Sequence, residues 1–175
     1  MLKIALIYGT IAGVIVISVM TAGIAMSGGE GGASSQAFGY LIMLIALSLI
    51  FIGIKRHRDQ NLGGVIKFGP AFGLGLAIAA VAGVFYVAGW EAYLASTDYA
   101  FINDYTDGLI EKKKAEGVTG EELQKIVENM EAMVKNYANP LYRLPITFSE
   151  IFPVGLIIAL ISALILRNSK AFPAR

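Results

Sequence analysis

Two acidic residues, Glu91 and Glu150, are the main candidates for chemistry in this chain. Glu91 follows one long apolar run and Glu150 precedes another. An acidic side chain at membrane depth is a candidate functional group, because placing a charge there is costly. Both residues lie at the ends of their runs, where water can reach them. A structural role and a functional role therefore both stay open.

The residue content excludes several kinds of catalytic site. The chain has no cysteine and His57 is its only histidine, which excludes cysteine–histidine nucleophiles and zinc sites built from these residues. His57 belongs to the basic run 55–58, and we expect its side chain to be solvated. Gly73-Leu74-Gly75 resembles half of a dinucleotide-binding motif. That motif requires a preceding strand, and none precedes it here, so the match does not indicate a nucleotide site. We expect no enzyme activity, no metal and no cofactor.

The elements that hold these residues are hydrophobic. Of the 175 residues, 56% are hydrophobic and 15% are charged, whereas soluble domains average about 25% charged residues. The 20 glycines also fit membrane helices, which tolerate glycine better than soluble helices do. This composition excludes a disordered chain, a nucleic-acid-binding module and a disulfide-rich secreted domain. It indicates an integral membrane protein.

Four runs are nearly free of charge and approach or exceed the roughly 20 residues that cross a bilayer. Backbone amides in hydrocarbon must pair within their own segment, so such runs form helices. The first run follows Lys3 but is longer than the core of a cleaved signal peptide, which is the alternative. The predicted fold is all-α, a single membrane domain of residues 1–175 with spans at about 4–26, 36–54, 68–92 and 147–166.

The distribution of basic residues predicts the orientation of the spans. The first loop, residues 27–35, is rich in Gly and Ser and carries only Glu30. Short basic loops stay in the cytoplasm. We therefore expect a bacterial inner-membrane protein with both termini cytoplasmic and residues 96–147 outside. The residues on the basic side are Lys3, Lys55, Arg56, Arg58, Lys67, Arg167, Lys170 and Arg175.

Residues 96–147 form a hydrophilic insert with nine acidic and six basic side chains. The pattern predicts two helices, one over about 98–116 that ends at Gly117, and one that begins with a capping box of Thr119 and Glu122. The second helix has an apolar stripe that is a candidate partner-binding surface. Burial of this stripe within the insert is the alternative. The candidate residues are Leu123, Ile126, Val127, Met130, Val134 and Tyr137.

Small residues at four-residue spacing predict close helix packing. Such stripes let helix backbones approach each other in lipid, where hydrophobicity does not drive association. We expect packing within the bundle, with a central third span, and a homo-oligomer interface is the alternative. The residues are Gly9, Gly13, Gly69, Gly73, Gly75, Ala79 and Gly83.

One stretch carries a resemblance to a known family. Residues 63–75, Gly-Gly-Val-Ile-Lys-Phe-Gly-Pro-Ala-Phe-Gly-Leu-Gly, follow a short basic loop. With residues 99–103, the capped helix from Thr119 and a last span that begins at Gly155, this stretch resembles the bacterial membrane family called domain of unknown function 4199. The resemblance covers nearly the whole chain. It implies a four-span inner-membrane protein with an outward helical insert. The family has no established activity, so it supplies no catalytic residues to carry over.

These observations favour a small non-enzymatic membrane protein whose insert binds a partner, as an accessory or assembly subunit. The alternative is a small-solute transporter acting as a homo-oligomer, because four short spans alone enclose little lumen. Transport predicts paired polar groups at the midplane or interrupted helices in two matching halves, and the sequence shows neither. The expected partners are the lipid bilayer and either another protein or a second copy, with no nucleic acid.

Overall fold

The structure is a computed structural model that describes residues 1–26 and 33–173. Most of the predicted Gly/Ser-rich loop, including Glu30, lies outside the described residues, as does Arg175. The described residues form seven helices and no strand: α1 (Leu2–Met26), α2 (Ala33–Leu47), α3 (Leu49–Asn61), α4 (Phe68–Ser96), α5 (Phe101–Ala115), α6 (Gly120–Tyr137) and α7 (Pro140–Leu166).

Four long apolar helices account for the four predicted spans. Helices α2 and α3 continue each other across Ser48, whose hydroxyl donates to the carbonyl of Ile45 at 2.6 Å, and together they provide one candidate span. Helices α1, α4 and α7 provide the other three. The all-α prediction, with a two-helix insert between the third and fourth spans, is confirmed.

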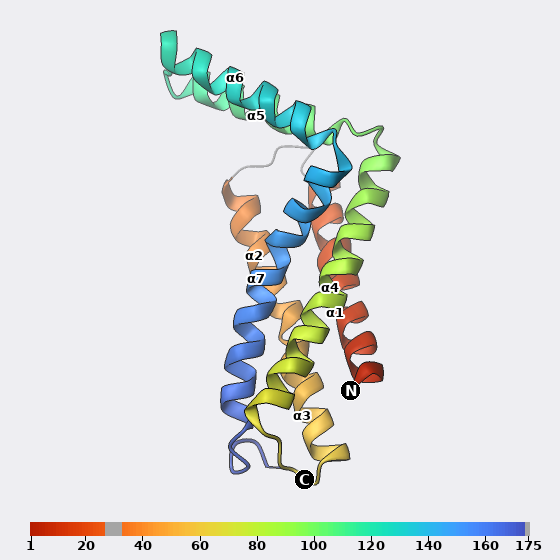
Figure 1. Cartoon of the computed structure of the whole chain (residues 1–175). Coiled ribbons are helices and arrows are strands. Elements are labelled where there is room, and N and C mark those ends of the chain that lie inside the picture. The colour runs from red at the N-terminus through yellow and green to blue at the C-terminus, as the bar shows by residue number, and fades with distance from the viewer. Residues whose placement is uncertain (27–32, 174–175) are drawn as a thin grey trace.

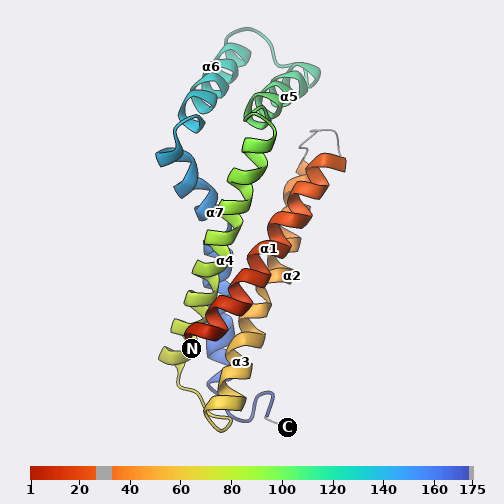
Figure 2. The same ribbon diagram turned by 90° about the vertical axis from the view of Figure 1, so that its right-hand side faces the viewer.

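The spans stand side by side, and the α5–α6 hairpin lies across one end of the bundle (Figure 1). Both termini lie at the opposite end, as the perpendicular view also shows (Figure 2). Helix α4 packs against both α1 and α7 and is therefore the central helix. We call the two ends the insert end and the basic end.

Two glycines let α1 approach the backbone of α4. A Cβ atom on Gly9 would lie 2.8 Å from the carbonyl oxygen of Ile78, and one on Gly13 would lie 2.5 Å from that of Ala82. Real Cβ atoms essentially never come this close to another backbone. Any larger residue at either position would therefore push the two helices apart.

The contact between α4 and α7 is built in the same way from both sides. Gly75 of α4 faces Ala159 of α7, and Gly155 of α7 faces Ala79 of α4. In each case an added Cβ would lie 2.7 Å from the alanine Cβ. These residues alternate along the contact, so each alanine methyl group occupies the space that the opposite glycine leaves.

The other three predicted packing residues differ in their surroundings. Gly83 makes room for the ring of Phe148, because an added Cβ would lie 2.5 Å from its Cε2 atom. Gly69 and Gly73 are exposed and have no atom within 4 Å of an added Cβ. Gly73 and Gly75 are two residues apart, which is more than half a helical turn, so they face opposite sides of α4.

The basic run 55–58 belongs to the last turns of α3 and is partly buried. His57 is only 8% exposed, and its Nδ1 atom lies 3.3 Å from Oδ1 of Asn61. The expectation of a solvated histidine was wrong, because α3 continues to Asn61 and turns this face of the helix toward the rest of the bundle.

Arg58 is fully buried at the basic end, where it holds the C-terminal segment. Its Nε atom donates to Oδ1 of Asp59 at 2.7 Å, and its Nη1 atom donates to the carbonyl of Ala171 at 2.9 Å. The Nη2 atom donates to the carbonyl of Phe172. A side chain from α3 thus satisfies backbone carbonyls that follow the end of α7.

Helix α7 begins at Pro140, one to two turns before the expected start of the fourth span near residue 147. Asn139 caps it, because its side-chain oxygen accepts a hydrogen bond from the amide of Leu141 at 3.0 Å. Pro140 fits the first helical position, where the missing N–H needs no partner. This extension brings Arg143, which the sequence places in the insert, into the last span.

We predict that Gly75→Leu destabilises the protein by about 1–3 kcal/mol, the usual cost of overpacking a filled core. Gly73→Leu is the matched control, since the same change on the same helix meets open space. Thermal unfolding in detergent measures the difference. Equal melting temperatures for the two variants would contradict the packing that places α4 at the centre.

Candidate functional site

The hairpin of the insert is closed by a glycine turn. The amide of Gly117 donates to the carbonyl of Lys114 at 3.0 Å, and the amide of Val118 donates to that of Lys113 at 3.1 Å. Gly117 has a φ of 87°, the left-handed conformation that ends many helices. Helix α6 then starts at Gly120 as predicted, although the Thr119 side chain makes no capping hydrogen bond.

The turn between α4 and α5 is strained. Asp98 and Tyr99 have φ values of 49° and 57°, a conformation that costs a non-glycine residue about 1–3 kcal/mol. This turn places the ring of Tyr99 over the guanidinium of Arg143, with 5.0 Å between the ring centroid and Cζ. The contact is a cation–π interaction, which offsets part of the strain.

An ion pair between α4 and α7 is the centre of this region. The Nε atom of Arg143 lies 2.6 Å from Oε1 of Glu91, and its Nη2 atom lies 2.7 Å from Oε2. The Arg143 side chain is 3% exposed and that of Glu91 is 25% exposed. The remaining Nη1 atom donates to the carbonyl of Tyr137 at 2.7 Å, at the end of α6. Arg143 thus joins three helices.

The same cluster contains Trp90, the only tryptophan of the chain. Its indole Nε1 donates to the hydroxyl of Tyr137 at 2.7 Å, and its ring packs edge-on against Phe101 of α5 at 4.9 Å between centroids. Burial raises the pKa of the Tyr137 hydroxyl, which therefore stays protonated at neutral pH. Trp90 is 6% exposed. Through its contacts with Tyr137 and Phe101 it links the end of α4 to both helices of the insert.

Glu150 is in a different environment from Glu91. It is exposed on α7, and the buried hydroxyl of Tyr86 on α4 donates to its Oε2 atom at 3.0 Å. None of the ion pairs among the described residues includes Glu150. Of the two acids that the sequence singled out, Glu91 is neutralised within the chain and Glu150 is not.

A pocket of about 370 Å³ lies beside Arg143, between the insert and the ends of α4 and α7. The hydrogen bonds of Arg143 go to Glu91 and Tyr137, so its charge is already compensated. The arrangement therefore ties the hairpin to the spans and does not present a free cation to an anionic ligand. The lining residues are Leu94, Asp98, Tyr99, Ile102, Asn103, Val134, Tyr137, Ala138, Pro140 and Arg143.

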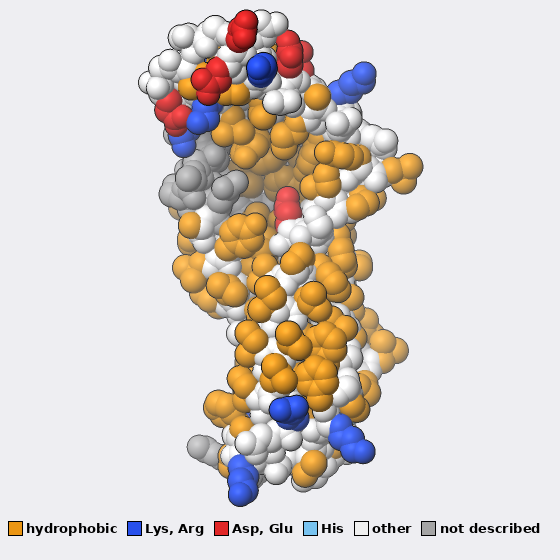
Figure 3. Space-filling view, turned by 60° about the vertical axis from the view of Figure 1, so that its left-hand side comes forward, with side chains coloured by type: hydrophobic (Ala, Val, Ile, Leu, Met, Phe, Trp, Pro, Cys, Tyr) orange, Lys and Arg blue, Asp and Glu red, His pale blue; other side chains and the backbone are white. Residues whose placement is uncertain are grey.

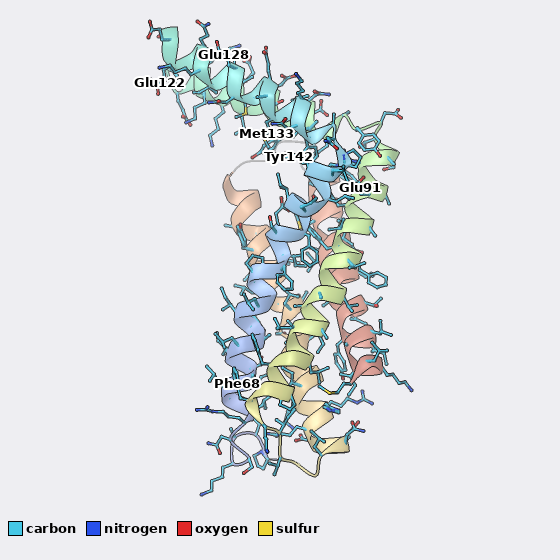
Figure 4. All side chains as sticks on the ribbon, viewed as in Figure 1. Phe68, Glu91, Glu122, Glu128, Met133 and Tyr142 are labelled. Atoms are coloured by element: carbon cyan, nitrogen blue, oxygen red, sulfur yellow. The ribbon has the colours of Figure 1, made fainter. Side chains whose placement is uncertain are left out.

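The predicted partner-binding stripe on α6 is partly exposed. All six residues, Leu123, Ile126, Val127, Met130, Val134 and Tyr137, are half-buried, and α6 has no fully buried residue. Helix α5 packs against α6, and Tyr137 joins the Arg143 cluster. The acidic Glu122 and Glu128 lie on the outer side of the hairpin, away from the bundle, whereas Met133 lies toward the bundle (Figure 4).

The Arg143–Glu91 pair was missed by the sequence reasoning. The available signal was an unpaired acid at the end of the third span and an arginine just before the fourth, on the same side of the membrane. Adjacent antiparallel spans bring such residues to the same level. The pairing itself depends on the start of α7 at Pro140, which the sequence reasoning placed too late.

We predict that Arg143→Met loosens the hairpin and shifts the emission of Trp90 to longer wavelength, because Glu91 loses its counter-charge and water reaches the indole. Removing one partner of a buried pair costs about 3–5 kcal/mol. Intrinsic fluorescence measures the shift without labels. Arg167→Met, at an exposed arginine after the other end of α7, is the control and should leave the spectrum unchanged. A parental spectrum for Arg143→Met would refute this function of the pair.

Comparison with known proteins gives one match. The family model described as "Protein of unknown function (DUF4199)" matches residues 7–168, which is nearly the whole chain. No curated protein and no solved structure matches the chain. The four long apolar helices and this match agree with the resemblance drawn from residues 63–75. The chain is a multi-pass membrane protein of unknown function and belongs to the DUF4199 family.

Proposed function

We propose that this chain is a non-enzymatic accessory or assembly subunit, whose α5–α6 hairpin binds another membrane protein outside the bilayer. The observation that carries the proposal is the attachment of the hairpin. Two hydrogen bonds, from Trp90 and Arg143 to Tyr137, hold its base to the ends of α4 and α7, and the Arg143–Glu91 pair joins these two ends to each other. A hairpin held in this way keeps a fixed position relative to the membrane, so little conformational entropy is lost when it binds.

The surface of the hairpin supports the same proposal. Its charged side chains gather on the side away from the bundle, and hydrophobic side chains gather on the side that faces the bundle (Figure 3). The α6 stripe is only half-buried. Met130 and Met133 add flexible side chains that adapt to a partner surface. An extracytoplasmic segment of another membrane protein would bury this side of the hairpin.

We further propose that the protein lies in the bacterial inner membrane with both termini in the cytoplasm. The residues Lys3, Arg56, Lys67 and Arg167 are all exposed, and each lies within or just outside the last two turns of a span at the basic end. Short basic segments stay on the cytoplasmic side. The hairpin, with more acidic than basic residues, would then lie on the outer side.

The alternative function is transport by a homo-oligomer. The helix contacts in the described part of the chain do not favour it. The surfaces where α4 meets α1 and α7 are filled by glycine, alanine and aliphatic side chains. An ion or solute pathway needs a more polar lining. The contact between the α4 and α7 backbones leaves no room for such a pathway along these two helices.

The proposed orientation predicts the labelling of introduced cysteines, which are unique because the chain has none. A cysteine at Asn129 on α6 should react with a membrane-impermeant maleimide in intact spheroplasts. A cysteine at Gln60 on α3 should react only after the membrane is opened. Both positions are exposed, so accessibility is matched. The reverse pattern would overturn the orientation.

The proposed binding surface predicts where a photo-crosslinker captures a partner in native membranes. Benzoylphenylalanine at Met133 should give an adduct with another protein, whereas the same probe at Asn129 on the charged side should not. The double variant Ile126→Glu with Met130→Glu should abolish the Met133 adduct, because two buried charges oppose docking.

The matched control adds two acids on the exposed side of the same helix, Asn129→Glu with Asn136→Glu, and should keep the adduct. Trp90 emission reports whether each variant keeps its hairpin attached. Equal adducts from both faces, or none from Met133 in a chain with parental emission, would contradict the proposal.

A further inference from the structure

Glu150 stands out because it is exposed within a surface that is otherwise apolar. Below the hairpin, the face of the bundle shown in Figure 3 is mostly hydrophobic. On α7, the residues that continue the exposed face from Glu150 toward the basic end are Ile157, Leu160, Ile161 and Leu164. Glu150 is thus the polar end of a lipid-facing stripe.

Two helices give the same depth for this carboxylate. Helix α7 rises about 1.5 Å per residue, which places Glu150 about 24 Å from Leu166, the last residue of the helix. On α4, the same rise places Tyr86 about 27 Å from Phe68, where that helix begins. The hydrocarbon core is about 30 Å thick. Both distances are measured from the basic end and are shorter than this thickness, so both residues lie inside the core, near its boundary at the insert end. The hydrogen bond between them agrees with this shared level.

Within residues 1–26 and 33–173, no basic side chain forms an ion pair with Glu150. The side-chain hydrogen bond that it accepts there comes from the neutral hydroxyl of Tyr86. Arg143 lies two turns further along α7 and is occupied by Glu91. The runs 4–26, 37–54, 68–90 and 144–166 contain no lysine or arginine. A second copy therefore has no basic residue at this depth, and a homo-oligomer would not neutralise the charge.

We propose that Glu150 and the exposed stripe of α7 bind a transmembrane helix of a different protein, and that this helix carries a lysine or arginine near its outer end. Charge complementarity selects this partner, because an acid within hydrocarbon gains most from a cation at the same depth. The apolar stripe below Glu150 packs against the rest of the partner helix. This surface is separate from the hairpin, so the inference goes beyond the function proposed above.

The test uses the full chain in lipid nanodiscs and synthetic transmembrane peptides with uncharged ends. One peptide carries a single lysine about four residues below its outer end, and the other carries leucine there. Energy transfer between a label at an introduced cysteine at Asn168 and a label on the peptide measures association. The parental chain should bind the lysine peptide about tenfold more tightly than the leucine peptide.

Glu150→Gln should remove this preference, because glutamine keeps the shape and still accepts the Tyr86 hydrogen bond but carries no charge. Glu150→Lys should instead prefer a peptide with glutamate at the same position. Glu121→Gln, an exposed acid on the hairpin, is the control and should keep the parental preference. Trp90 emission shows that each variant is folded.

Equal binding of the lysine and leucine peptides by the parental chain would overturn the proposal, and Glu150 would then be a lipid-facing protonated acid. A lysine preference that survives in Glu150→Gln would overturn it as well. The result is independent of the hairpin. The double variant Ile126→Glu with Met130→Glu should keep the peptide preference even where it loses the Met133 adduct.

Discussion

The close approach of α4 to both α1 and α7 is the contact on which the rest of the structure depends. In lipid, the hydrophobic effect does not hold helices together, so association depends on packing at short distance. Gly9, Gly13, Gly75 and Gly155 make this distance possible, because each leaves the space that a neighbouring backbone or methyl group fills. The central position of α4 then fixes where its two ends, and everything attached to them, lie.

At each end of the bundle a buried arginine joins a non-spanning segment to the spans. At the basic end, Arg58 bonds to the backbone carbonyls that follow α7. At the insert end, Arg143 bonds to Glu91 and to the last carbonyl of α6. In both places the planar guanidinium satisfies several acceptors at once, which a lysine would not do. These two side chains thus tie the adjoining segments to the packed spans.

The two acids near the insert end differ because of their positions on their helices. Glu91 turns inward toward Arg143 and is part of the framework. Glu150 turns outward, and only a neutral hydroxyl from its own chain bonds to it. The exposed Glu150 and the half-buried α6 stripe of the hairpin above it are the two features from which the partner surfaces proposed above are inferred.

The amino-acid sequence by itself determined the fold class, the four spans, the two insert helices and the glycine that closes their hairpin. Those features follow from local rules: the length of apolar runs, helical periodicity and the φ > 0 that Gly117 adopts. Only the tertiary structure decided that Gly75 faces a neighbour while Gly73 does not, that His57 and Arg58 are buried, and that Arg143 pairs with Glu91 and leaves Glu150 alone. These outcomes depend on how each helix is rotated about its axis and on where α7 begins. Both are set by contacts between residues far apart in the chain, because a helix of apolar residues exposed to lipid has no polar face to fix its rotation.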